Sequence, residues 1–96
     1  MTSEQVHRVS IFGQSYLLRT EENPEYVRNV AHYVDGKFYE VAERESSLPA
    51  NKVAILSALN IADELFKLRE EKERTEELVS NKIEELLELI AKKVGE

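Results

Sequence analysis

The chain contains no cysteine, and it has only two prolines and three glycines among its 96 residues. Without cysteine it can form neither a disulfide framework nor a thiolate metal site. No proline follows Pro49, and the only glycine after that position is Gly95. This lack of helix breakers predicts a single helix from about residue 49 to residue 94, with a length of roughly 70 Å.

The chain also has few positive charges: it contains 13 lysines and arginines but 19 aspartates and glutamates, which gives a net charge of −6. Nucleic acids and anionic membrane surfaces both attract basic segments, so we expect neither as a partner. The densest apolar stretch, residues 53–62, falls well short of the ~18 residues that span a bilayer. The N-terminus lacks a basic and apolar signal segment, so we expect a cytoplasmic protein without membrane insertion.

Signatures of catalysis are missing as well. The sequence has no glycine-rich phosphate loop and no Gly-x-Ser-x-Gly elbow. His7 and His32 are the only imidazoles, and neither has a second histidine or clustered carboxylates at ligand spacing. Asp63 and Glu64 are neighbours on a helix and diverge, which makes them a poor acid/base pair. We therefore expect no enzyme, no cofactor and no metal.

An alternating pattern near the N-terminus predicts a β-hairpin over roughly residues 7–20, with a glycine turn at Gly13-Gln14. The apolar residues of its inner face are Val9, Ile11, Tyr16 and Leu18. Phe12 and Leu17 are out of phase with this set and are expected on the second face. An isolated hairpin is marginal in water, so a helix or another chain must cover the inner face.

A helix is predicted next, beginning at Asn23-Pro24-Glu25. Asparagine can accept from free backbone N–H groups, proline fits the first helical position, and glutamate suits the positive helix end. The apolar stripe of this helix runs to about residue 45 and consists of Val27, Val30, Ala31, Val34, Phe38, Val41 and Ala42. Gly36 lowers the stability of the helix by about 1 kcal/mol relative to alanine. A glycine at such a position suggests that another backbone passes close by.

The long helix has three parts. The proximal apolar segment, residues 53–68, is apolar on more than one side and should contact both its own N-terminal domain and a second chain. The charged segment, residues 69–77, has no large apolar residue. The distal apolar segment, residues 78–94, has a second stripe beyond the reach of the N-terminal domain, so it needs a partner helix.

Two polar features of the long helix, the charged segment and Asn60, each have two possible interpretations. The charged segment is either a solvated bridge with internal Glu–Lys pairs or a charged binding surface. Asn60 lies within the proximal apolar segment, and a buried asparagine must find hydrogen-bond partners. It either bonds to nearby backbone or forms a symmetric bond that fixes the register of an oligomer.

Three stretches carry a resemblance to a known family: residues 9–16 (Val-Ser-Ile-Phe-Gly-Gln-Ser-Tyr), residues 30–35 (Val-Ala-His-Tyr-Val-Asp) and, most specifically, residues 51–65 with Ala-Leu-Asn-Ile-Ala-Asp-Glu-Leu. From about Val9 to Leu68 the chain resembles the ZapA family of bacterial cell-division proteins. The resemblance implies an α+β fold with an N-terminal β-hairpin, one short helix and one long helix ending in a coiled coil. It also implies an antiparallel tetramer made of two dimers.

The resemblance further implies a non-enzymatic regulator at the mid-cell division site, which binds FtsZ filaments and bundles them to stabilise the division ring. We expect residues 1–66 to form the N-terminal domain with its dimerisation segment, and residues 67–96 the coiled-coil tail. The candidate FtsZ-binding residues are Lys37, Arg44 and Lys52. The candidate dimerisation residues are Val53, Leu56, Asn60 and Leu65. The candidate tetramerisation residues are Val79, Ile83, Leu86 and Ile90.

A second class of function is a generic coiled-coil adaptor or chaperone-like subunit, as in prefoldin-like proteins. In those subunits the hairpin lies between two long helices. Here the predicted hairpin precedes a short helix and then a long one, which favours the division-protein interpretation.

Overall fold

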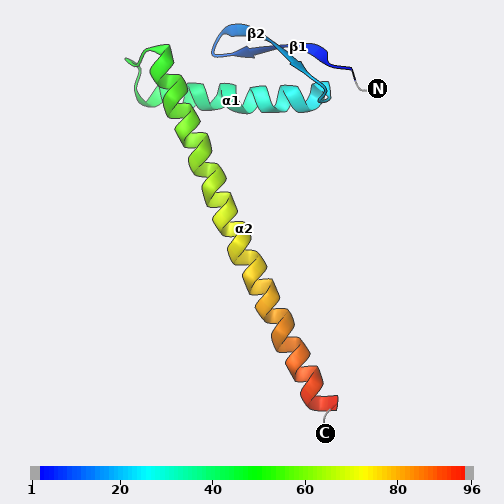
Figure 1. Cartoon of the computed structure of the whole chain (residues 1–96). Helices are drawn as coiled ribbons and strands as arrows, with labels where there is room; N and C mark the ends of the chain where they lie inside the picture. Colours follow the sequence, from blue (N-terminus) through cyan, green and yellow to red (C-terminus); the bar gives the residue numbers. More distant parts are fainter. Residues whose placement is uncertain (1–2, 95–96) are drawn as a thin grey trace. The chain divides into compact units, whose positions relative to one another are not determined.

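A computed structural model describes residues 3–94 of the chain, and it contains two strands followed by two helices (Figure 1). The elements are β1 (Gln5–Ile11), β2 (Gln14–Thr20), α1 (Pro24–Arg44) and α2 (Ala50–Val94). The strands pair antiparallel as a hairpin. This confirms the predicted order of a hairpin, a short helix and a long helix.

The chain divides into two compact units, one up to Ile61, which we call the head, and one from Ala62 onward, which we call the C-terminal unit. The head contains the hairpin, α1 and the first turns of α2. The C-terminal unit is the remainder of α2. The domain boundary expected after residue 66 stays a prediction.

The turn of the hairpin lies one residue earlier than the sequence pattern predicts. Ile11 pairs with Gln14, so the turn consists of Phe12 and Gly13. Both have positive φ, 52° for Phe12 and 79° for Gly13, as a type I′ turn requires. The expectation that Phe12 lies on the second face of a strand is therefore wrong, and a bulky side chain occupies a backbone conformation that usually disfavours it.

Contacts with α1 hold Phe12 in this conformation. Its backbone N–H donates to Oδ1 of Asp35 at 2.8 Å, and the bond is partly buried. The Phe12 ring lies 5.7 Å from the Phe38 ring and 5.1 Å from the Tyr39 ring, measured between centroids. Tilted and edge-on aromatic pairs at such distances are favourable. The tip of the hairpin is thus anchored to the middle of α1 by one hydrogen bond and two ring contacts.

The core of the head is small. Val9 of β1 packs with Val27 and Ala31 of α1, and Ile11 packs against this cluster. Val9 and Ile11 alternate along β1, whereas Val27 and Ala31 are one helical turn apart, so each element contributes the face that its periodicity predicts. Near the start of α2, Val53 is also buried within the head.

The signals for the start of α1 are confirmed. Asn23 has extended backbone and its Oδ1 accepts from the N–H of Tyr26 at 2.8 Å, with Pro24 as the first helical residue. The explanation offered for Gly36 is wrong within this chain. A Cβ at Gly36 would have no heavy atom within 4 Å outside its own helical turns, so no other backbone in the described part of the chain lies that close.

We expect Asp35→Ala to lower the free energy of unfolding by about 1–2 kcal/mol, because the Phe12 N–H would lose its acceptor in a partly buried position. Asp35→Asn keeps an acceptor oxygen and should cost less. Urea denaturation measures both values, and Asp63→Ala, which removes an exposed carboxylate of α2, is the control. Equal stability of Asp35→Ala and the wild type would show that this hydrogen bond does not stabilise the tip of the hairpin.

Candidate functional site

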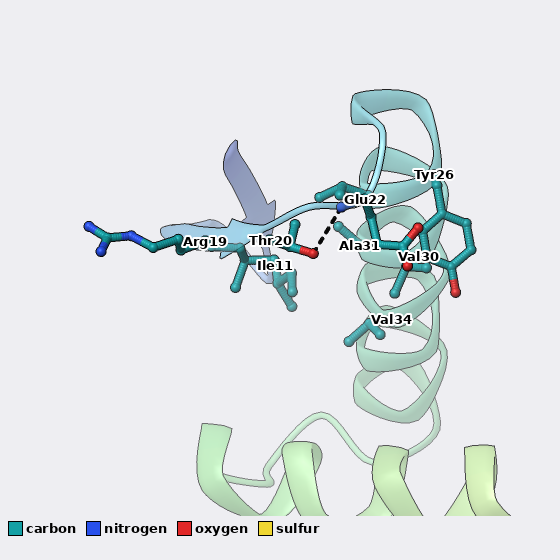
Figure 2. A pocket seen from close by; sticks show the side chains of 10 residues that line it. Ile11, Arg19, Thr20, Glu22, Tyr26, Val30, Ala31 and Val34 are labelled. Atoms are coloured by element: carbon teal, nitrogen blue, oxygen red, sulfur yellow. Dashed lines mark hydrogen bonds between the residues drawn. The ribbon is translucent and has the colours of Figure 1, made fainter. Parts of the chain in front are cut away.

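An apolar groove runs between β2 and α1. Because α1 packs against β1 and not β2, the inner face of β2 is left partly uncovered, and Leu18 is 42% exposed. The groove has a volume of about 320 Å³. Its lining is mostly apolar and includes Ile11, Leu18, Tyr26, Val30 and Val34 (Figure 2).

The polar residues at this groove lie at its rim. Figure 2 shows the Arg19 side chain directed away from α1, and the backbone N–H of Glu22 donates to Oγ1 of Thr20 at 3.2 Å. A groove with an apolar floor and a polar rim suits another apolar surface better than a reacting small molecule. The apolar stripe predicted for this helix includes Val30 but not Tyr26. Tyr26 precedes Val30 by four residues, and this helical spacing could have identified it as part of the same face.

The proximal apolar segment offers further apolar surface. Within the head, Leu56 and Leu59 are exposed, at 43% and 63%. Val53 differs from them, because it is only 1% exposed without any second chain present. The structure therefore gives Val53 a role in the core of its own head, whereas Leu56 and Leu65 are exposed and Asn60 is half-buried; the dimerisation role of all four stays a prediction.

Asn60 is half-buried, and its side chain makes no hydrogen bond to any residue that the structure describes. Of the two interpretations, a local bond to backbone is thus not observed. One turn earlier, the hydroxyl of Ser57 is fully buried and likewise has no partner within residues 3–94. Two polar groups with unused bonding capacity therefore lie one turn apart in an otherwise apolar stretch of α2.

The distal apolar segment lies in the C-terminal unit and is uncovered. The four candidate tetramerisation residues Val79, Ile83, Leu86 and Ile90 are each at least 50% exposed. No described side chain of residues 62–92 is buried. Helices are stabilised mainly by packing of their apolar face, so an exposed stripe of this kind favours packing against another helix.

The charged segment forms ion pairs along its own helix. Lys72 Nζ lies 3.9 Å from Oε1 of Glu76, and just before the segment Lys67 Nζ lies 3.0 Å from Oδ2 of Asp63. The hydrogen bond that the Lys67 ammonium donates to Asp63, together with the negative charge of Asp63, raises the pKa of Lys67 above its usual value. Exposed pairs of this kind support a solvated helix, as one of the two interpretations expected.

The three basic candidates differ in their surroundings. The side chain of Lys37 is only 13% exposed, lies 3.4 Å from Oε2 of Glu40, and sits 5.4 Å from the centroid of the Tyr33 ring. Arg44 is exposed in the last turn of α1, and Lys52 is exposed in the first turn of α2. Arg44 and Lys52 are thus more accessible to a partner than Lys37, whose charge is already engaged.

Among residues 3–94 no group of three or more histidine and acidic side chains could hold a metal ion. The described helices include none that is both long and apolar enough to cross a membrane. His7 lies on the inner side of β1, where its Nε2 is buried without a hydrogen-bond partner.

A small protomer with two uncovered apolar surfaces belongs to the class of self-associating docking proteins. The sequence model for "Cell division protein ZapA" matches residues 8–90. The chain is 46% identical over 76 residues to cell division protein ZapA of Geobacillus thermodenitrificans, covering 77% of this chain and 84% of that protein. The chain therefore belongs to the ZapA family of cell division proteins.

A second relative, cell division protein ZapA of Geobacillus kaustophilus, is 43% identical over 79 residues, covering 80% of this chain and 87% of its own. Among solved structures, the chain is similar to a ZapA mutant dimer from Geobacillus stearothermophilus, with a TM-score of 0.64 and 36% identity. That match covers 83% of this chain and 93% of the other. Fold and sequence thus agree on the family.

We expect Asn60→Leu to leave α2 helical but to allow more than one register between associated chains, because a buried polar residue often specifies register at a cost in stability. Multiple amide resonances for residues near position 60 would reveal this in NMR spectra. Asn81→Leu makes the same exchange at an exposed position of α2 and should keep a single set. A single set of resonances for Asn60→Leu as well would leave Asn60 without a role in register.

Proposed function

We propose that this protein binds FtsZ filaments and crosslinks them at the mid-cell division site, in the cytoplasm. Membership of the ZapA family supports a role in cell division. The observation that carries the crosslinking role is the pair of uncovered apolar surfaces, one on the head with the proximal segment and one on the distal segment. A crosslinker needs binding heads and a means of joining them, and these surfaces supply the means.

The proposed dimer forms through the head side of the molecule. Leu56, Asn60 and Leu65 of the proximal segment would contact a second chain, and the groove between β2 and α1 offers further apolar surface. Asn60 would then find its hydrogen-bond partner across the interface. The solved relative is described as a dimer. Burying exposed leucines contributes about 25 cal/mol for each Å² removed from water, which favours this assembly.

The proposed tetramer joins two such dimers through antiparallel contacts of the distal segment. The stripe of Val79, Ile83, Leu86 and Ile90 supports this step, because its exposed side chains have spacings of three and four on one helix. An antiparallel arrangement would put one pair of heads at each end of the assembly. Two filaments could then be held at once, with the charged segment as a solvated connection between the apolar contacts.

The proposed contact with FtsZ uses Arg44 and Lys52, with Lys37 in a supporting position. Arg44 and Lys52 are exposed near the connection between α1 and α2. Lys37 lies two helical turns before Arg44, so the two share one side of α1. The adaptor or chaperone-like alternative finds no specific support, because the hairpin precedes both helices and does not lie between them.

We expect Ile83→Glu to convert tetramers into dimers while the heads stay folded, because burying an unpaired carboxylate costs several kcal/mol. Sedimentation velocity measures the assembly. Asn81→Glu adds the same charge on the opposite side of α2 and should remain tetrameric. If the Ile83→Glu dimer bundled FtsZ as well as wild type in light scattering, joining through the distal segment would not be the mechanism.

Neutralising the basic residues should weaken binding itself. We expect the variant with Lys37→Gln, Arg44→Gln and Lys52→Gln to pellet with FtsZ filaments about tenfold less tightly, because each lost charge contact at an exposed site contributes a few tenths of a kcal/mol to about 1 kcal/mol. Wild-type binding should also fall as salt rises. The variant with Lys72→Gln, Arg74→Gln and Lys82→Gln is the charge-matched control. Normal pelleting of the first variant would place the contact elsewhere on the head.

A further inference from the structure

A second groove lies on the other side of the hairpin, between the outer edge of β1 and α1. It has a volume of about 430 Å³ and differs from the apolar groove in being lined by polar and cationic residues. The residues around it are Arg8, Val9, Ser10, Arg28, Asn29, Ala31 and His32. Ala31 also lines the apolar groove proposed above for dimerisation, whereas the other six belong to none of the surfaces proposed for dimerisation, tetramerisation or FtsZ contact.

The backbone of β1 exposes hydrogen-bonding groups at this groove. Ile11 and Gln14 flank the two-residue turn and pair with each other, so they form a hydrogen-bonded pair. Pairs alternate along an antiparallel ladder, and Ser10 and Arg8 therefore turn their N–H and C=O groups away from β2. Within residues 3–94 the sheet has two strands, so no described strand covers this edge of β1. Such an edge can accept an additional strand.

The side chains around the open edge are positively charged. Arg8 of β1 and Arg28 of α1 form no ion pair with any carboxylate in the described part of the chain. No aspartate or glutamate lines the groove, although the whole chain has a net charge of −6. Guanidinium groups bind carboxylates in a forked geometry, which makes a peptide with acidic side chains the complementary ligand.

We propose that this groove binds an extended acidic segment of a partner protein, which adds to β1 as a third strand and places its carboxylates against Arg8 and Arg28. The backbone of Ser10 and Arg8 supplies the strand hydrogen bonds, and the two arginines select negative charge. Val9 lines the groove between these two residues. The site does not depend on the identity of the partner that Arg44 and Lys52 contact.

A second copy of this chain fits the edge poorly. Arg8 is the central residue of β1, so the antiparallel pairing that overlaps two β1 strands along their full length would set Arg8 opposite Arg8. Like charges directly opposite each other on neighbouring strands are destabilising. The charge at the edge thus discourages self-pairing, as charged residues on edge strands commonly do, while it attracts an acidic strand.

The first test uses a blocked peptide of consecutive glutamates, titrated into the full-length ¹⁵N-labelled protein. Val9 faces α1, so Arg8 lies on the opposite face of the sheet from Arg28, and consecutive glutamates present carboxylates to both faces. Amide shifts should change along residues 6–10 and 28–32. Ser10→Pro removes an outward N–H without touching the β1–β2 ladder and should weaken binding about tenfold or more. The matched control is Ser15→Pro at the cross-strand partner of Ser10, which blocks the opposite edge of the hairpin and should leave affinity within about twofold.

The second test separates charge from strand addition. The double variant Arg8→Gln with Arg28→Gln should lose about tenfold or more in affinity, whereas Arg19→Gln with Arg74→Gln changes net charge equally and should bind normally. A peptide of consecutive lysines should not bind. The acidic peptide with N-methyl groups on alternate residues should lose affinity even if Ser10→Pro fails to fold.

Several results would overturn the proposal. These are no shift changes at millimolar peptide, equal losses for Ser10→Pro and Ser15→Pro, or unchanged binding after both arginine substitutions. Protection of the amides of residues 8 and 10 from hydrogen exchange in the free protein would show that another copy already covers the edge. Binding of anionic phosphatidylglycerol vesicles by Arg8 and Arg28, without peptide binding, would assign the cations to a lipid surface instead.

Discussion

Only four hydrophobic side chains are buried among the described residues, and this small core determines how the rest of the chain is used. Three of them, Val9, Val27 and Ala31, join β1 to α1, and Val53 places the start of α2 in the same head. The remaining leucines, isoleucines and valines are mostly exposed in a single chain. A chain of this size buries about 60–65% of its unfolded surface, and the proposed association would remove part of the exposed apolar remainder from water.

The elements with strong local signals could be predicted from the sequence. Asn23 and Pro24 defined the start of α1 because capping depends on the residues themselves, and α2 was predictable because nothing in its sequence breaks a helix. The turn of the hairpin could not be placed correctly. The alternating pattern makes Gly13 the first residue of the turn and leaves Phe12 in the strand. In the structure Phe12 is itself a turn residue with positive φ, because Asp35, 23 residues away, accepts its N–H. Tertiary contacts of this range are invisible to local pattern.

The candidate sites were likewise predictable from the sequence only in part. Periodicity identified which residues of α2 are apolar, but it could not distinguish Val53, which its own head buries, from Leu56, which it leaves exposed. Lys37 was chosen as an FtsZ-binding candidate because it lies near the connection between the helices. In the structure, however, its ammonium group pairs with Glu40 and lies over the Tyr33 ring. Arg8 and Arg28 are 20 residues apart in sequence and line one groove only because β1 packs on α1. Their separation in sequence does not indicate that they lie close together in the fold.

The two grooves beside the hairpin differ in chemistry, so the proposed self-association and the proposed peptide docking use different edges of the hairpin. Beside β2, the groove against α1 is apolar and suits a second chain of the same protein, whose exposed surface is rich in leucine. Beside β1, the groove is cationic, and its charge disfavours a symmetric copy. A second chain on the β2 side would therefore leave the β1 edge open. Because the same helix, α1, forms one wall of both grooves, an assembled protein can present the cationic edge without giving up its apolar contact.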